Sequence, residues 1–149
     1  MEKILEHLRG RVGTELGVSE WWEITQERVD AFADATDDHQ FIHVDREAAA
    51  KTPFGGTIAH GFLTLSLTVP MGNEVSLEVG EPKMAINYGL DKVRFPAPVP
   101  VGSRIRVRVV LSAVEEVPGG IHLSQTMTME IEGSDKPGLV AERLSRLYY

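Results

Sequence analysis

The segment from His60 to about Met71 constrains the fold of this chain more than any other part of it. As a helix, it carries apolar residues around most of its circumference, namely Phe62, Leu63, Leu65, Leu67 and Val69. Such a helix is not amphipathic, so we expect it to be buried on nearly every side. Pro70 and Gly72 are expected to end it. The rest of the chain must therefore cover this helix.

The second half of the chain can supply that cover, because its apolar residues recur with the period of two that β-strands show. The alternating apolar residues are Ile105, Val107, Val109, Ile121, Leu123, Met127 and Met129. Gly119 and Gly120 separate the two runs and indicate a hairpin. Met84–Phe95 and Leu139–Tyr148 complete a predicted sheet of five or so strands. We therefore predict an α+β fold in which an antiparallel β-sheet wraps around a long central α-helix.

The first half of the chain carries signals for helix starts. Trp21–Ile24 is typical of a short strand, and Thr25 can cap a helix over Gln26–Thr36. Asp45 can cap a second short helix that runs through Ala50. The residues between these two helices are expected to form a loop.

Length and charge limit the classes of protein that remain. The 149 residues predict a single domain over residues 1–149. The net charge of −7, without a long basic run, excludes binding of nucleic acid or an anionic membrane through bulk charge. The chain has no cysteine, so it can form neither disulfides nor thiolate metal sites.

The sequence also shows no signal peptide and no membrane-spanning segment. Residues 1–11 lack the apolar stretch of a signal peptide. The longest apolar-rich stretch, Thr57 to Met71, is interrupted by polar residues and is shorter than the roughly 20 residues of a membrane span. We therefore expect a soluble cytoplasmic protein.

Asp38 and His43 form the first candidate for chemistry. Five residues apart in a loop, they can curl to share one ligand, although a fully extended chain would separate them by up to about 17 Å. A carboxylate accepts hydrogen bonds, and an imidazole titrates near neutral pH, so the pair could position a water and move its proton. By residue type alone, a turn aspartate and a packed histidine are the commoner outcome.

Two further segments are candidates for binding. Residues 54–61 lead into the apolar helix, whose first backbone N–H groups have no partner within the helix, and Gly61 allows a ligand carbonyl to approach closely. A glycine needed only for packing explains this segment equally well. Lys92 and Arg94 could meet phosphates, although solvated strand charges are more common.

The order and spacing of these features resemble the signature of the MaoC-like dehydratase family, which includes the (R)-specific enoyl-CoA hydratases. The matching positions are Asp38, Ile42, His43, Asp45, Ala48 to Ala50, Phe54, Gly55, Ile58, Ala59, His60 and Gly61, with a later block at Asn87, Arg94, Phe95, Pro98, Val99 and Gly102. Gln40 and Phe41 stand where the commoner pattern has Asn and Pro, a departure that concerns substrate range more than chemistry.

This resemblance implies a hot-dog fold and a homodimer with an acyl tunnel near the subunit interface. It also implies syn addition of water to a trans-2-enoyl-CoA thioester, or the reverse dehydration. Asp38 would act chiefly as the general base, while His43 would orient the water and help return a proton. The backbone N–H of Gly61 would stabilise the enolate-like oxygen.

The remaining implied site residues bind rather than react. His60, Phe54 and Gly55 belong to the substrate-binding segment around Gly61. Lys92 and Arg94 are candidates for the phosphates of coenzyme A. No metal or organic cofactor is expected, because coenzyme A is part of the substrate and the sequence shows no two-His zinc arrangement with a supporting carboxylate.

Two other functions remain open. A hot-dog thioesterase often carries a carboxylate early on its central helix, whereas residues 60–67 carry none. A non-catalytic acyl-CoA binder, or a subunit that supports an active partner, would not need both Asp38 and His43. His39 is expected to be a solvated loop residue and Asp45 a helix cap.

Overall fold

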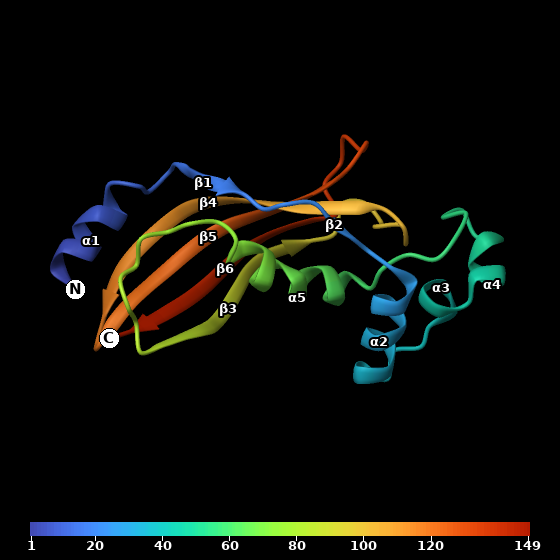
Figure 1. Cartoon of the computed structure of the whole chain (residues 1–149), viewed down its shortest axis with the longest axis horizontal. Coiled ribbons are helices and arrows are strands. Elements are labelled where there is room, and N and C mark those ends of the chain that lie inside the picture. Colours follow the sequence, from blue (N-terminus) through green and yellow to red (C-terminus); the bar gives the residue numbers. More distant parts are fainter.

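A curved antiparallel sheet of six strands covers one face of helix α5 (Gly61–Gly72). The strand order is β1-β4-β5-β6-β3, and β2 pairs with β4 beside this path. The strands are β1 (Glu15–Val18), β2 (Trp22–Glu23), β3 (Met84–Arg94), β4 (Arg104–Val117), β5 (Gly120–Ile131) and β6 (Leu139–Tyr148). The computed structural model describes every residue from Met1 to Tyr149. Figure 1 shows the sheet arching over α5.

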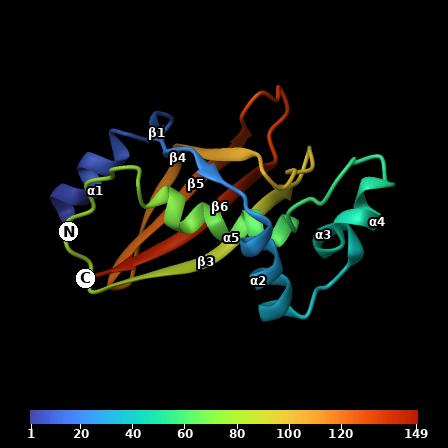
Figure 2. The same cartoon turned by 45° about the vertical axis from the view of Figure 1, so that its right-hand side comes forward.

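Four further helices lie at the two ends of the sheet (Figures 1 and 2). They are α1 (Glu2–Arg9) at one end and α2 (Gln26–Thr36), α3 (Phe41–Val44) and α4 (Arg46–Ala50) at the other. Both predicted caps are confirmed: Thr25 Oγ1 accepts the N–H of Arg28, and Asp45 Oδ1 accepts that of Ala48. None of the five helices combines the length and the apolar character that a membrane crossing requires.

The strands predicted for the second half of the chain are confirmed. β4 and β5 meet at a turn where Gly119 has a φ of 74°, a left-handed conformation that glycine adopts without strain. The short strand predicted at Trp21–Ile24 is present as β2, and the sheet has one strand that was not predicted, because β1 also pairs with β4. β1 has only four residues and no alternation, so its pairing with β4 comes from the tertiary fold.

The core lies between α5 and the concave face of the sheet. Leu63, Leu67 and Met71 project from α5 into one cluster with the inward side chains of β4 and β5. Those strand residues are Ile105, Val107, Val109, Met127 and Met129, none more than 1% exposed. Complete burial of one such side chain stabilises a fold by about 1.5–3 kcal/mol. This packing holds the first turn of α5 in a defined place against the sheet.

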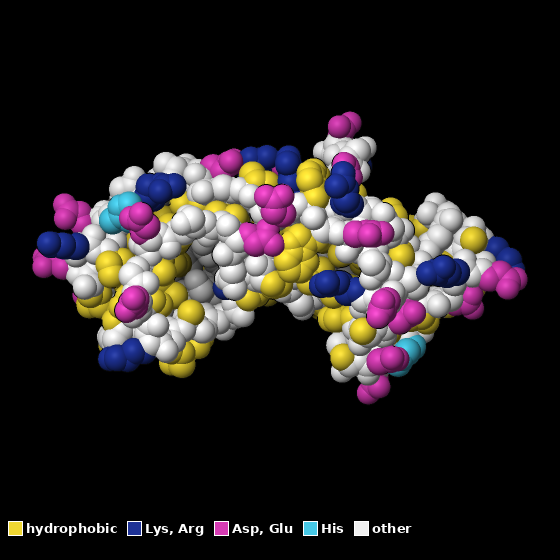
Figure 3. Space-filling view, in the orientation of Figure 1, with side chains coloured by type: hydrophobic (Ala, Val, Ile, Leu, Met, Phe, Trp, Pro, Cys, Tyr) yellow, Lys and Arg dark blue, Asp and Glu magenta, His cyan; other side chains and the backbone are white.

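The expectation that α5 is buried on nearly every side is wrong for the single chain. Phe62, Ser66 and Pro70, which are four residues apart along the helix, form an exposed stripe, and Phe62 is 69% exposed. Figure 3 shows hydrophobic side chains at the surface where α5 lies. Pro70 lies inside the last turn rather than ending the helix. Because proline has no N–H, the carbonyl of Ser66 receives no helical hydrogen bond from residue 70.

Candidate active site

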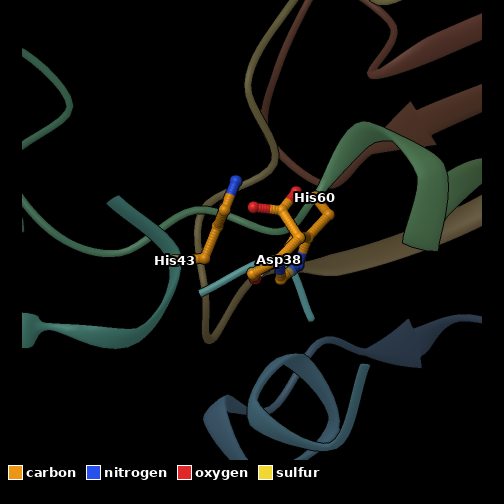
Figure 4. A group of neighbouring side chains, drawn as sticks. All are labelled: Asp38, His43 and His60. Carbon is orange, nitrogen blue, oxygen red and sulfur yellow. Dashed lines mark hydrogen bonds between the residues drawn. The ribbon is translucent and has the colours of Figure 1, made fainter. Parts of the chain in front are cut away.

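Three polar side chains meet at the N-terminal end of α5. Asp38 comes from the loop after α2, His43 from α3, and His60 from the residue before α5. One ligand atom of each lies within 4.8 Å of the others. Figure 4 shows the three side chains gathered at the junction of these elements. The structure therefore brings Asp38 and His43 together, as the sequence pattern predicted.

His43 lies on a short helix rather than in the loop that we expected. The helix α3 is closed by bonds from the His43 N–H to the Gln40 carbonyl and from the Asp45 N–H to the Phe41 carbonyl. His43 is 7% exposed, and its Nδ1 lies 2.7 Å from the carbonyl oxygen of Ile58. A carbonyl can only accept, so Nδ1 carries a proton and Nε2 of the neutral ring keeps its lone pair.

The charge state of His43 follows from its surroundings. Burial lowers the pKa of His43, and this effect outweighs the bond to Ile58 and the nearby Asp38 carboxylate, both of which raise it. The neighbouring His60 lowers the pKa further. The ring is therefore neutral at pH 7 and can accept a hydrogen bond from a water at Nε2.

Asp38 is held at its backbone while its carboxylate stays exposed. The preceding residue, Asp37, ends α2 in a left-handed conformation with a φ of 58°, which aspartate tolerates better than most residues. The carbonyl oxygen of Asp38 accepts a hydrogen bond from His60 Nε2 at 2.9 Å. Its Oδ1 accepts only a long bond, 3.4 Å, from the N–H of Gln40. The carboxylate is thus free to engage a ligand.

His60 is buried next to Asp38 and His43, and its side chain is 2% exposed. Its ring stacks on that of His43, with centroids 3.8 Å apart and planes inclined by 23°. Phe32 of α2 packs against the same ring, at a centroid distance of 4.9 Å. Nδ1 of His60 is buried without a hydrogen-bond partner. His60 therefore contacts the candidate dyad and does not line the adjoining cavity.

Gln26 is a supporting residue that sequence reasoning missed. Its Nε2 donates to the backbone carbonyl of His43 at 2.7 Å, and its Oε1 accepts from Thr57 Oγ1 at 2.6 Å. One amide thus joins α2, α3 and the segment before α5. A glutamine at the first position of an amphipathic helix was the only local signal, and it could not identify partners 17 and 31 residues away.

An apolar cavity of about 290 Å³ opens beside His43. Two other predicted site residues, Phe54 and Gly61, line it together with Thr64 and Phe95. A Cβ on Gly61 would lie 3.0 Å from the ring of Phe95, so this close approach requires glycine. Gly61 is the first residue of α5, where backbone N–H groups have no partner within the helix.

The remaining predicted residues lie outside this cavity. Lys92 and Arg94 are exposed near the end of β3, next to Phe95, and Lys92 sits at a register shift with a φ of 51°. Gly55 turns the chain after α4 with a φ of 71°. His39 is solvent-exposed, as expected, and pairs with Asp34 at 2.8 Å, which raises the pKa of His39.

The cluster of Asp38, His43 and His60 is close enough for a metal site to be considered. The two stacked rings, however, direct their in-plane lone pairs along nearly parallel planes. A zinc ion needs ligand atoms that converge tetrahedrally at about 2.0–2.2 Å. The arrangement favours hydrogen bonding to a water over coordination of a cation.

Relatives with known names share most of this chain. One is 3-hydroxyacyl-thioester dehydratase Z of Mycobacterium tuberculosis, 53% identical over 140 residues that cover 93% of this chain and 92% of the relative. Nodulation protein N of Rhizobium leguminosarum bv. viciae is 48% identical, covering 99% of this chain and 93% of the relative.

Solved structures share the fold. The (R)-hydratase from A. caviae involved in PHA biosynthesis superposes with a TM-score of 0.73 at 25% identity, covering 90% of this chain and 94% of that one. The monoamine oxidase regulatory protein from Archaeoglobus fulgius gives a TM-score of 0.78 at 23% identity, covering 92% and 90%. The predicted hot-dog fold is confirmed.

A family model described as MaoC like domain matches residues 8–132. This match includes α5, every residue of the candidate site and all strands except β6, which follows residue 132. The resemblance noted in residues 38–61 is thus confirmed over most of the chain, and the protein belongs to the MaoC-like dehydratase family.

Proposed function

We propose that this chain catalyses the reversible addition of water to a trans-2-enoyl-CoA thioester, giving the (R)-3-hydroxyacyl-CoA. The observation that carries the proposal is the neutral ring of His43, close to the Asp38 carboxylate and lining an apolar cavity. The name of the mycobacterial relative, a 3-hydroxyacyl-thioester dehydratase, supports the same reaction class.

Asp38 and His43 divide the handling of the water between them. The Asp38 carboxylate takes a proton from the water while the oxygen attacks C3 of the enoyl group. His43 Nε2 accepts the second hydrogen bond of that water and fixes its direction. The protonated Asp38 then gives this proton to C2 on the same face, which completes the addition of water and restores the carboxylate. General acid–base groups of this kind contribute about 10²–10⁴ in rate.

Gly61 supplies the electrostatic part of the mechanism. Its N–H, at the positive end of α5, donates to the thioester oxygen as negative charge develops there. Loss of one such donor costs about 10²–10³ in rate. Phe54 lines the acyl cavity, and Gly55 gives the turn that places it there. No step needs a metal or an organic cofactor.

Lys92 and Arg94 are proposed to contact the phosphates of coenzyme A. Both are exposed and lie within three residues before Phe95, which lines the cavity. The Arg94 guanidinium is bonded only to the carbonyl of Val93, at 2.7 Å, so most of its donors remain available. A phosphate accepts such donors well.

A homodimer is proposed because two adjoining surfaces of the single chain are uncovered. β3 lies at one edge of the sheet and pairs only with β6. Met84, Tyr88 and Leu90 on this strand are between 44% and 52% exposed. A second copy at the β3 edge and the α5 stripe would bury them. Light scattering should give twice the chain mass.

The test of the reaction is hydration of crotonyl-CoA by the purified protein. Asp38→Asn and His43→Ala should each lower kcat at least about a hundredfold, while circular dichroism stays unchanged. Full activity in either variant contradicts the assigned dyad. The product should be the (R) alcohol. Release of free thiol from acyl-CoA instead of hydration would favour a thioesterase.

A further inference from the structure

The ring of His60 is the buried polar group in this site that the proposed reaction does not use. It is 2% exposed and lies between Phe32 and His43. Its Nε2 must carry a proton, because the group facing it is the carbonyl oxygen of Asp38. Nδ1 is then an unprotonated acceptor, buried with no donor near it.

This bonding is unfavourable for a residue that only fills space. A buried acceptor without a donor lowers stability, and an apolar ring in this place would avoid that cost. The contacts of His60 instead go to the two residues of the dyad, one through a hydrogen bond and one through a ring face.

We propose that His60 is a positioning residue for the dyad: its Nε2–H holds the Asp38 backbone, and its ring holds the plane of His43. This inference rests on the proposed function and deepens it. His60 is 2% exposed and does not line the cavity, whereas the Asp38 carboxylate is open to solvent, so His60 acts only through its two neighbours.

The two contacts of His60 have different consequences. The hydrogen bond to the Asp38 carbonyl orients a loop whose residues are otherwise exposed. The stacked ring covers one face of His43 and keeps that face from water. Asp38, from the loop, and His43, from α3, are the ionisable groups that face His60, and α2 presents Phe32 to it.

Two substitutions separate these contacts. His60→Phe keeps an aromatic ring against His43 and loses the donor to Asp38. His60→Gln keeps an N–H donor at the position of Nε2 and loses the ring. His39→Gln is the matched control, because His39 is an exposed histidine next to Asp38 whose ring pairs with Asp34 outside the site.

His60→Phe should lower kcat for crotonyl-CoA hydration by about tenfold to a hundredfold, as for a small misplacement of a catalytic group, with KM unchanged. Its melting temperature should stay close to that of the unmodified protein, because removal of the unpaired acceptor offsets loss of the bond to the Asp38 carbonyl. If His60 were only structural, His60→Phe would leave kcat unchanged and lower the melting temperature.

His60→Gln should change the pH dependence of kcat/KM. With one ring face open to water, burial no longer lowers the pKa of His43 as strongly, so this pKa rises. Protonated His43 has no lone pair at Nε2, and the acid limb of kcat/KM should therefore move to higher pH. His39→Gln should leave kcat, KM and the profile unchanged.

The titration of His43 itself separates this inference from the proposed function. The chain has five histidines, so the ring Cε1–H signals can be assigned by NMR and followed with pH without any substrate. A raised pKa of His43 in His60→Gln supports the positioning role even if crotonyl-CoA is not hydrated. An unchanged His43 titration in His60→Gln, or unmodified kcat in His60→Phe, overturns it.

Discussion

Nδ1 of His43 lies 2.7 Å from the carbonyl oxygen of Ile58. This contact selects the tautomer in which Nε2 of the neutral ring is the acceptor. Ile58 is itself held, since its N–H donates to the carbonyl of Ile42 at 3.0 Å in α3. The ring of His43 and the carbonyl that orients it are therefore held together by α3. The protonation of His43 can be measured as a consequence of this arrangement.

The first prediction concerns pH. Burial lowers the pKa of His43 below 6.5, so the hydration rate kcat/KM should exceed half of its full value at pH 6.5 and reach half only in more acidic buffer. Stability should fall in the same window, because below pH 6.5 the unfolded chain binds the proton more readily than the folded one. A pH series of rates and urea midpoints measures both.

A rate that is already halved at pH 6.5 would contradict the buried, neutral His43. The variant His7→Gln is the control for the other titrating histidines, since His7 lies on α1 at the far end of the sheet. It should leave the rate profile unchanged.

The second prediction concerns Gly61. In Gly61→Ala the new Cβ would lie 3.0 Å from Phe95, so the ring must move and the cavity changes shape. We expect kcat/KM to fall by about tenfold to a hundredfold, as for other small misplacements of a substrate. Phe95→Leu in the same chain should recover part of the loss.

The activity of the double variant, Gly61→Ala with Phe95→Leu, decides how the substitution at Gly61 acts. If the double variant is as slow as Gly61→Ala alone, the effect arises from the backbone of α5 and not from contact with Phe95. Gly56→Ala is the matched control, because a Cβ there meets no atom within 4 Å.

The third prediction concerns Gln26. In Gln26→Leu the His43 carbonyl and the Thr57 hydroxyl both lose a buried partner. The free energy of unfolding should fall by about 1–3 kcal/mol, and kcat should fall with it because α3 is no longer tied to α2. Urea unfolding measures the first effect. Glu27→Gln, on the exposed side of the same helix, should leave kcat unchanged and lower the free energy of unfolding by less than about 1 kcal/mol, the contribution of an acidic residue in a first turn.

The elements that could be predicted from the sequence are those specified by neighbouring residues. The caps at Thr25 and Asp45 need only a side chain and an N–H three residues on. The alternation of Ile105 with its neighbours likewise records which face of β4 is buried. The position of α5 followed from its apolar composition, but composition could not tell which side would remain open at Phe62.

The candidate site was predictable only in part, because much of its geometry joins distant segments. Asp38 and His43 are close in sequence, and their order indicated the dyad. The stacking of His43 on His60 and the bond from Gln26 to Thr57 arise only once α2, α3 and α5 are packed together. No local pattern carries that information.

The last prediction concerns the convex face of the sheet, where Arg106 and Arg108 both donate to Glu130 across β4 and β5. Burial alone would raise the pKa of Glu130, but the bonds to the two arginines outweigh it, and the pKa lies below 4.5. The contribution of Glu130 to stability is therefore present above pH 4.5 and is lost as the pH falls through the lowered pKa.

Glu130→Gln should thus lower the free energy of unfolding by about 1 kcal/mol at pH 7, a value reduced for the partial exposure of the pair. The difference from the unmodified protein should shrink steadily in acid, which urea unfolding between neutral and acidic pH can follow. Glu116→Gln, an exposed residue of the same sheet, is the control. A difference that grows in acid would mean that Glu130 is protonated more readily in the folded chain than in the unfolded one, contrary to the two arginine contacts.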